Sequence, residues 1–331
     1  MSLPTFKLLR PRTIEEAVGF LAAHGAALQI LAGGTDLIPS MKQRLFTPPV
    51  VMDIRGIEEL RGIYVTPGIG VEIGALTPLS AIEDSAFMRR HYRVLYEAAI
   101  TVASPILRNM GTIGGNICLD TRCLWYNQSL QWRRSCGFCI KKDGDLCHVA
   151  PGGSTCWAVF SGDTPPALLC LGAEIEIAGP SGMRRIALKD FYTNIGDARC
   201  KLESNEMLTR IFLPETTSGW MGSYMKLRVR GSIDYPLAGV AVAFRKNGGP
   251  IGGPIEDAQV AITAVNPAPL LVPGAAHALI GKQINEHTAS VVGELAAKTA
   301  KPLTTSALTP EYRRDMIRVF AKRAVLAAAQ G

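Results

Sequence analysis

The stretch LQILAGGTDL at residues 28–37 decides the fold of the N-terminal part of the chain. A short apolar run, which predicts a buried strand, ends in two glycines and leads into a predicted helix at 37–45. A capping box formed by Thr13 and Glu16 predicts a preceding helix, and residues 50–54 predict the next strand. Strand, glycine turn, helix and strand in this order indicate a small α/β unit.

The rest of the chain has a different pattern. Alternation around a Pro-Gly pair predicts a hairpin at 61–76, and an apolar face predicts a helix at 93–104. From about residue 220, alternating strands are followed by two helical segments. We therefore expect an α+β fold, with a small α/β unit, then a larger α+β region, then an α+β domain with an antiparallel sheet. The expected limits of these domains are 1–55, 56–219 and 220–331.

Two glycine turns are candidate phosphate sites. A strand that ends in glycines and opens a helix presents backbone N–H groups to an anion, assisted by the helix dipole. Residues 28–37 fit this description; Thr35 adds a hydroxyl, while we expect Asp36 to cap the next helix. The sequence GTIGGN at 111–116 offers a second turn of the same type. Neither matches the fingerprint GxGxxG or the phosphate loop, and either alone is commonly a tight turn, but a pair suits an extended dinucleotide.

Composition narrows the class of protein. The chain has 331 residues, 47% hydrophobic and 19% charged, which indicates a globular protein of two or three domains. No apolar run is long enough to span a bilayer, and the N-terminus lacks an export signal, so we expect a cytoplasmic protein without a membrane partner. In that compartment, clustered cysteines are more often metal ligands or buried thiols than disulfides. The net charge of +7 does not distinguish between partners.

Three motifs in this order resemble the FAD-binding subunit of the xanthine dehydrogenase and carbon monoxide dehydrogenase family. They are GGTDL at 33–37, TIGGN at 112–116 and DTPPALL at 163–169; YMK at 224–226 and DYPLA at 234–238 extend the resemblance over essentially the whole chain. It implies three domains, with FAD extended across the two N-terminal ones. It also implies a molybdenum cofactor-binding large subunit and a [2Fe-2S] small subunit as partners, in a dimer of heterotrimers.

The resemblance also implies roles for single residues. Backbone amides of residues 30–37 would bind the FAD pyrophosphate. Residues 112–116 would contact the flavin side and the second phosphate. Asp163 would bind a ribose or ribityl hydroxyl; without the resemblance it is a helix N-cap, and Lys226 is a solvated strand lysine. The complete implied set is Ile30, Leu31, Ala32, Gly33, Gly34, Thr35, Asp36, Leu37, Thr112, Ile113, Gly114, Gly115, Asn116, Asp163, Leu208 and Lys226.

An insert at about 121–160 separates the second motif from the third, where the family pattern has a short connection. It contains five of the eight cysteines and shows little periodicity, so it cannot fold on hydrophobic burial alone, and a bound metal is physically reasonable. Four thiolates suit either tetrahedral zinc or a [4Fe-4S] cluster. Zinc modules usually have two close CxxC pairs, whereas the insert has one, at 136–139. We expect a [4Fe-4S] cluster; zinc and no metal are the alternatives.

The insert resembles the cluster loop of the 4-hydroxybenzoyl-CoA reductase branch of this family, in anaerobic aromatic degradation. That resemblance implies Cys123, Cys139, Cys147 and Cys156 as ligands, whereas spacing alone favours Cys136 with Cys139. The implied function is electron relay from a ferredoxin, through the cluster and FAD, to the molybdenum subunit for reductive dehydroxylation. This role requires no catalytic acid or base on the chain, and we nominate none.

The insert carries four basic residues, and the sequence also allows two other classes of function. Arg133, Arg134, Lys141 and Lys142 are either a solvated loop or a docking patch for an acidic ferredoxin. One alternative is a zinc-stapled binding protein, but the basic residues are spread along the chain without an aromatic-rich stripe, so we expect no nucleic-acid partner. The other is an NAD(P)H-dependent flavin dehydrogenase subunit, although no nicotinamide fingerprint is present.

Overall fold

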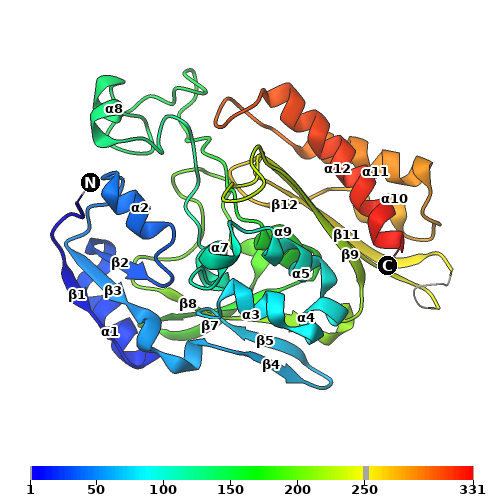
Figure 1. The fold of residues 1–331 in the computed structure, drawn as a ribbon, viewed down its shortest axis with the longest axis horizontal. Helices are drawn as coiled ribbons and strands as arrows, with labels where there is room; N and C mark the ends of the chain where they lie inside the picture. The colour runs from blue at the N-terminus through cyan, green and yellow to red at the C-terminus, as the bar shows by residue number, and fades with distance from the viewer. Residues whose placement is uncertain (1, 249–252, 331) are drawn as a thin grey trace.

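A computed structural model describes residues 2–248 and 253–330, which form three β-sheets in successive parts of the chain (Figure 1). One sheet is parallel, and the other two, each covered by helices, are antiparallel. The predicted α+β class is confirmed. Each sheet falls within one of the predicted domains, whose limits stay predictions. Within the described residues, no helix is both long and apolar enough to cross a membrane.

The first sheet has the order β1-β3-β2 and contains the glycine turn. Its strands are β1 (Lys7–Leu9), β2 (Leu28–Leu31) and β3 (Val50–Asp53), and its helices are α1 (Ile14–His24) and α2 (Leu37–Lys42). Thr13 caps α1 as predicted, accepting from the amide of Glu16 at 3.2 Å, and Ile14, Ala17 and Leu21 are the buried positions of that helix. Helix α2 is shorter than predicted.

The second sheet is antiparallel, in the order β4-β5-β8-β6-β7. Its strands are β4 (Ile63–Thr66), β5 (Gly70–Gly74), β6 (Glu174–Gly179), β7 (Gly182–Ala187) and β8 (Met207–Pro214). The hairpin predicted at 61–76 is confirmed as β4 and β5. The helices of this region are α3 (Leu79–Asp84), α4 (Ala86–His91), α5 (Arg93–Ile100), α6 (Pro105–Arg108), α7 (Ile113–Ile117) and α9 (Thr164–Cys170).

The helix predicted at 93–104 ends early, and the backbone explains why. Ala103 has a positive φ of 46°, a conformation that a helix does not contain, and Ser104 is extended because Pro105 follows it. The chain then starts α6, with the Ser104 hydroxyl accepting from the amide of Leu107. Because of this break, residues 101–111 form a separate segment that lies beside the first glycine turn.

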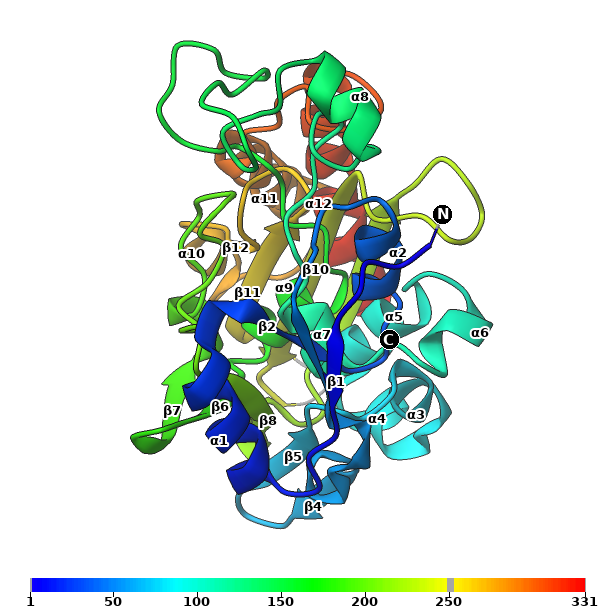
Figure 2. The ribbon, with the colours of Figure 1, turned by 90° about the vertical axis from the view of Figure 1, so that its left-hand side faces the viewer.

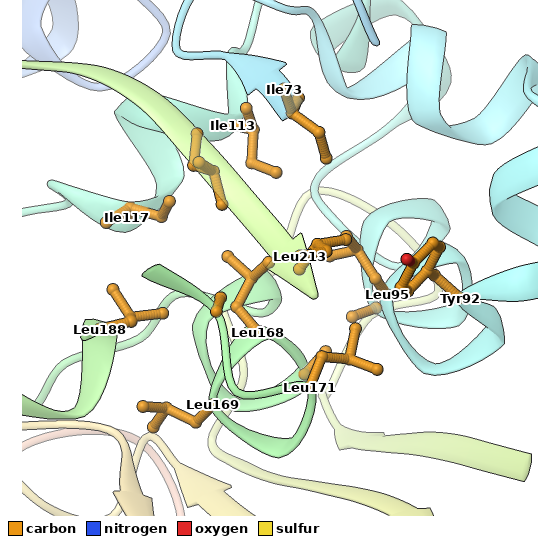
Figure 3. Close-up of a cluster of buried hydrophobic side chains, with 14 of the residues drawn as sticks. Ile73, Tyr92, Leu95, Ile113, Ile117, Leu168, Leu169, Leu171, Leu188 and Leu213 are labelled. Carbon is orange, nitrogen blue, oxygen red and sulfur yellow. The ribbon is translucent and has the colours of Figure 1, made fainter. Parts of the chain in front are cut away.

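Helix α9 lies at the centre of the molecule. All seven of its residues are buried, and Leu168 packs in one hydrophobic cluster with residues of the five-stranded sheet and of α5, among them Ile73, Leu213 and Leu95 (Figure 3). Its two prolines occupy the first turn, where the missing amides break no helical hydrogen bond. The apolar composition of this motif therefore reflects complete burial.

The third sheet has the order β12-β11-β10-β9. It consists of β9 (Met221–Leu227), β10 (Ala238–Lys246), β11 (Ile255–Thr263) and β12 (Leu270–Leu271), covered by α10 (Ala275–Leu279), α11 (Glu286–Thr299) and α12 (Pro310–Gln330). In β10, Val240 and Val242 belong to the cluster under these helices, whereas Ala241 and Ala243 belong to the cluster around α9. Alternating large and small residues let the strand pack on both faces.

The insert at 121–160 stands at one end of the molecule, opposite the β4–β5 hairpin (Figures 1 and 2). It contains α8 (Leu130–Ser135) and otherwise irregular chain, as predicted. Two of its long-range hydrogen bonds join it to distant segments: the amide of Leu124 donates to the Thr305 carbonyl, and Arg133 Nη2 to the Arg44 carbonyl, both at 2.8 Å. The insert therefore contacts both the N-terminal unit and the segment before α12.

Candidate cofactor sites

A cavity of about 1030 Å³, called the large cavity below, lies where the glycine motifs meet. Its size is at the upper end of the usual range for ligand sites, which suits a dinucleotide. Most residues predicted for FAD line it: Ile30, Ala32, Gly33, Gly34, Thr35, Asp36, Leu37, Thr112, Gly114, Gly115, Asn116, Asp163 and Leu208. The side chains of Leu31, Ile113 and Lys226 do not, and Ile113 belongs to the hydrophobic core.

The first glycine turn has the geometry of an anion site. A Cβ at Gly33 would lie 1.9 Å from the Met110 carbonyl oxygen, and Gly34 has a φ of 72°, so both positions require glycine. Among the described residues, the N–H groups of Gly33, Gly34 and Thr35 donate to no backbone carbonyl. The three residues directly precede α2 in the chain and line the large cavity.

The second glycine cluster differs from the first. The amide of Ile113 donates to the Thr77 carbonyl and that of Gly114 to the Ala75 carbonyl, both at 3.0 Å, while Gly115 donates to Thr112 Oγ1 at 3.1 Å. These three amides are therefore engaged within the chain, unlike those of the first turn, and the part of this cluster in phosphate binding stays a prediction. Close packing is the physical reason for the glycine: a Cβ at Gly114 would lie 2.7 Å from the Ala75 oxygen.

Asn116 connects the second motif to the third. Its side-chain oxygen accepts from both the amide and the hydroxyl of Thr164, at 3.0 and 2.7 Å. This places the start of α9, and with it Asp163, at the wall of the large cavity.

Asp163 is held from the C-terminal sheet. Its carboxylate accepts from Tyr224 Oη at 2.7 Å and from Lys226 Nζ at 2.9 Å. Burial raises the pKa of Asp163, and Lys226 and Tyr224 act in the opposite direction. Lys226 also donates to the Thr101 carbonyl and is almost fully buried, so the solvated-lysine alternative is wrong. Lys226 reaches the large cavity through Asp163.

Asp36 does not cap α2 with its side chain, contrary to the prediction. Its carboxylate instead accepts from Arg122 Nη1 at 3.1 Å and from Tyr235 Oη at 2.9 Å, and the Arg122 guanidinium lies 4.0 Å from the Tyr235 ring centroid. All three residues line the large cavity. The DYPLA motif contains Tyr235, but the sequence gives no sign that the first residues of the insert reach this cavity.

Four cysteines line a second, much smaller space, called the cysteine hollow below. They are Cys123, Cys139, Cys147 and Cys156, the four predicted ligands. Cys136, at the end of α8, does not line it. All eight cysteines of the chain lie in its described part and are free thiols. Burial raises the pKa of Cys123 and of Cys156 to about 11, so metal binding would release protons from these thiols.

The geometry of the cysteine hollow does not suit a single ion. Among the residues described, no group of three or more His, Cys, Asp or Glu is placed to hold one metal ion. The hollow measures about 20 Å³, close to the space of one water molecule, so a polynuclear cluster would require the four side chains to turn outward. Four cysteine thiols are nevertheless the donor set that iron–sulfur clusters use, and four cysteines line this space.

Comparison with known proteins decides the family. The family model described as the FAD binding domain in molybdopterin dehydrogenase matches residues 4–216, and the CO dehydrogenase flavoprotein C-terminal domain matches 223–328. The chain belongs to the FAD-binding subunits of the molybdenum hydroxylase family. The expected family is therefore confirmed, and with it an FAD-binding domain over residues 4–216.

Individual relatives cover the whole chain. The carbon monoxide dehydrogenase medium chain of Afipia carboxidovorans is 32% identical over 97% of this chain and 96% of its own length. The nicotinate dehydrogenase FAD-subunit of Eubacterium barkeri is 27% identical over 96% of this chain and 94% of its own length. A crystal structure of Cu,Mo-CO dehydrogenase aligns with a TM-score of 0.82, at 30% identity, over 100% of this chain and 99% of that one. Members of the family thus act on different substrates.

The predicted basic patch is only partly at the surface. Arg133 is 1% exposed and Lys141 is 6% exposed, with its Nζ 2.9 Å from Asp120. These two side chains are internal to the fold, so a patch of four solvated cations is wrong. Arg134 is exposed, and Lys142 is partly so beside Asp143.

We predict that Gly33→Ala weakens FAD binding about fivefold or more, because the added methyl group would collide with the Met110 carbonyl at a cost of about 1–3 kcal/mol. Fluorescence titration of the FAD-free protein measures the affinity. The matched control is Gly19→Ala in α1, where a Cβ meets nothing within 4 Å. Equal affinity in the two variants would contradict the site.

A second prediction concerns the segment 101–111. Arg108 donates to both carboxylate oxygens of Glu83 at 2.8 Å and to the Val102 carbonyl at 2.9 Å, and this lowers the pKa of Glu83. We expect Glu83→Gln to reduce the free energy of unfolding by about 1–3 kcal/mol at neutral pH.

The difference in free energy of unfolding between wild type and Glu83→Gln should depend on pH in a definite direction. Because the pKa of Glu83 is lower in the folded state, its contribution is complete above the ordinary glutamate pKa and is lost as the pH falls through the folded value. Urea unfolding of wild type and variant should therefore converge in strong acid. A difference that persists unchanged there would show that the ion pair is not its source.

Proposed function

We propose that this chain is the FAD and [4Fe-4S] electron-transfer subunit of a 4-hydroxybenzoyl-CoA reductase type enzyme, with ferredoxin as the electron donor. One observation carries the proposal: four cysteines from distant parts of the insert line the cysteine hollow, which lies beside the large cavity. The names of the relatives say nothing of a cluster in this subunit, so support for it comes from the cysteines and from the resemblance of the insert.

The chain's own residues would hold the two groups as follows. The free amides of the first glycine turn would bind the pyrophosphate of FAD, with Thr35 and the N-terminal side of α2. Asp163, fixed by Tyr224 and Lys226, would accept from a sugar hydroxyl, and Leu208 would contact a ring. Four cysteines, Cys123, Cys139, Cys147 and Cys156, would ligate the cluster. When bound, FAD supplies two-electron and the cluster one-electron transfer.

The implied partners follow from the family. Carbon monoxide dehydrogenase relatives are named as medium chains, which implies subunits of other sizes beside them. We propose a molybdenum-binding large subunit and a [2Fe-2S] small subunit, assembled as a dimer of heterotrimers. The chemistry on the thioester substrate belongs to the large subunit, because no acid–base group on this chain is assigned to it.

A second candidate function is a flavin subunit that exchanges electrons with NAD(P)H. The specific observation in its favour is that the relatives include several subunits named as dehydrogenases. Anaerobic mixing separates the two: reduced ferredoxin should bleach the flavin of the assembled enzyme, and NADH should not. Rapid bleaching by NADH would favour the alternative.

We predict that Cys123→Ser, Cys139→Ser, Cys147→Ser and Cys156→Ser each lose cluster iron, because each removes one of four ligands. Cys136→Ser is the matched control, since this thiol belongs to the same insert but lies outside the hollow. Iron per chain and the electron paramagnetic resonance (EPR) signal of the reduced protein measure the result, and bound FAD reports an intact fold. Loss of iron in the Cys136 variant would contradict the ligand set.

A separate prediction concerns Arg134 and Lys142, the two basic residues of the insert that are at least partly exposed. If an acidic ferredoxin docks at the insert, charge reversal of Arg134 and Lys142 to Glu should slow flavin reduction by ferredoxin about tenfold at low salt, with a smaller effect at high salt. Lys282→Glu, an exposed lysine before α11, is the control. Rates that do not respond to either charge reversal or salt would exclude docking at this surface.

A further inference from the structure

The segment 120–123 forms a wall between the large cavity and the cysteine hollow. Asp120 and Arg122 line the large cavity, whereas Cys123 lines the hollow. Arg122 and Val159 exchange both backbone hydrogen bonds at 2.8 Å, so the two ends of the insert are paired at this wall. The proposed cofactors therefore lie on opposite sides of one short stretch of chain.

One carboxylate in this wall binds a cation from each side. Lys141 Nζ, whose side chain lines the hollow, lies 2.9 Å from Asp120 Oδ1. Arg199 Nη1, whose side chain lines the large cavity, lies 3.7 Å from the same oxygen. Asp120 is 15% exposed and Lys141 6%, so water screens this pair weakly.

Further contacts hold the group rigid. Lys141 Nζ also donates to the Gly196 carbonyl at 2.9 Å and to the Thr121 hydroxyl, and it lies 4.7 Å from the Tyr126 ring centroid. A Cβ at Gly196 would lie 2.8 Å from Cys156 Sγ, so the loop that carries Arg199 packs directly on a proposed ligand.

We propose that Asp120 is a positioning residue whose charge sets the reduction potentials of both cofactors together, which rests on the function proposed above. Reduction places additional negative charge on each side of the wall. Lys141 and Arg199 favour that charge, and Asp120 offsets both cations at once. The shared carboxylate therefore lowers both potentials together.

The test is Asp120→Asn, which keeps the shape and removes the charge. Redox titration of the protein with both cofactors bound, followed by EPR for the cluster and by absorbance for FAD, should show both potentials rising. We expect about a tenfold change in the equilibrium for cluster reduction, or ~59 mV for one electron. The matched control is Asp145→Asn, an exposed carboxylate of the same insert, which should shift neither potential appreciably because solvent screens it.

A second variant keeps the proposal testable if Asp120→Asn does not fold. Lys141→Gln removes the cation on the cluster side and leaves Asp120 less compensated, so the cluster potential should fall, and the FAD potential should fall less. Restoration by Lys141→Arg supports an electrostatic role. A change in thermal stability with both potentials unmoved would show that the group is structural and overturn the proposal.

The remaining outcomes are also decisive. A shift confined to one cofactor in Asp120→Asn overturns the shared role. Wild-type protein that binds FAD but carries no iron refutes the cluster of the proposed function, and this inference with it, before any variant is made. Iron present in wild type with unshifted potentials in both variants refutes this inference alone.

Discussion

The backbone pairing of Arg122 with Val159 is the interaction on which the special features of this chain depend. It closes an insert that has little regular secondary structure besides α8. Cys123 directly follows the pair and Cys156 lies three residues before it, so both enter the hollow from a fixed base. The same pairing directs the Arg122 side chain to Asp36, within the large cavity. The insert is therefore joined directly to the part of the fold that the family motifs form.

The motifs that identify the family also contact one another in sequence order. Gly33 packs on the Met110 carbonyl, Asn116 holds Thr164, and Asp163 binds Lys226. The first contact joins the first motif to the segment just before the second, and the other two join successive motifs, so the N-terminal turn, helix α9 and the C-terminal sheet are positioned by polar or close-packed contacts around the large cavity. This is a physical reason why motifs far apart in the chain occur together, and why their combination is more informative than any one of them.

Local patterns in the sequence predicted most elements, and contacts between distant segments explain what it missed. The capping box at Thr13 and the hairpin at 61–76 both express short-range rules. By contrast, the amides at 113–115 are engaged by residues 75–77 and 112, and Arg133 and Lys141 are buried by partners elsewhere in the chain. A glycine run or a basic run does not reveal such partners. The roles of Asp120, Arg122 and Arg199 were missed for the same reason.

The most direct test is the metal and flavin content of the unmodified chain, isolated anaerobically and examined by EPR after reduction. The account predicts one FAD and about four iron atoms per chain, with the signal of a reduced [4Fe-4S] cluster. A yellow protein that contains zinc or no metal at all, with its four hollow-lining thiols fully reactive after unfolding, would contradict it.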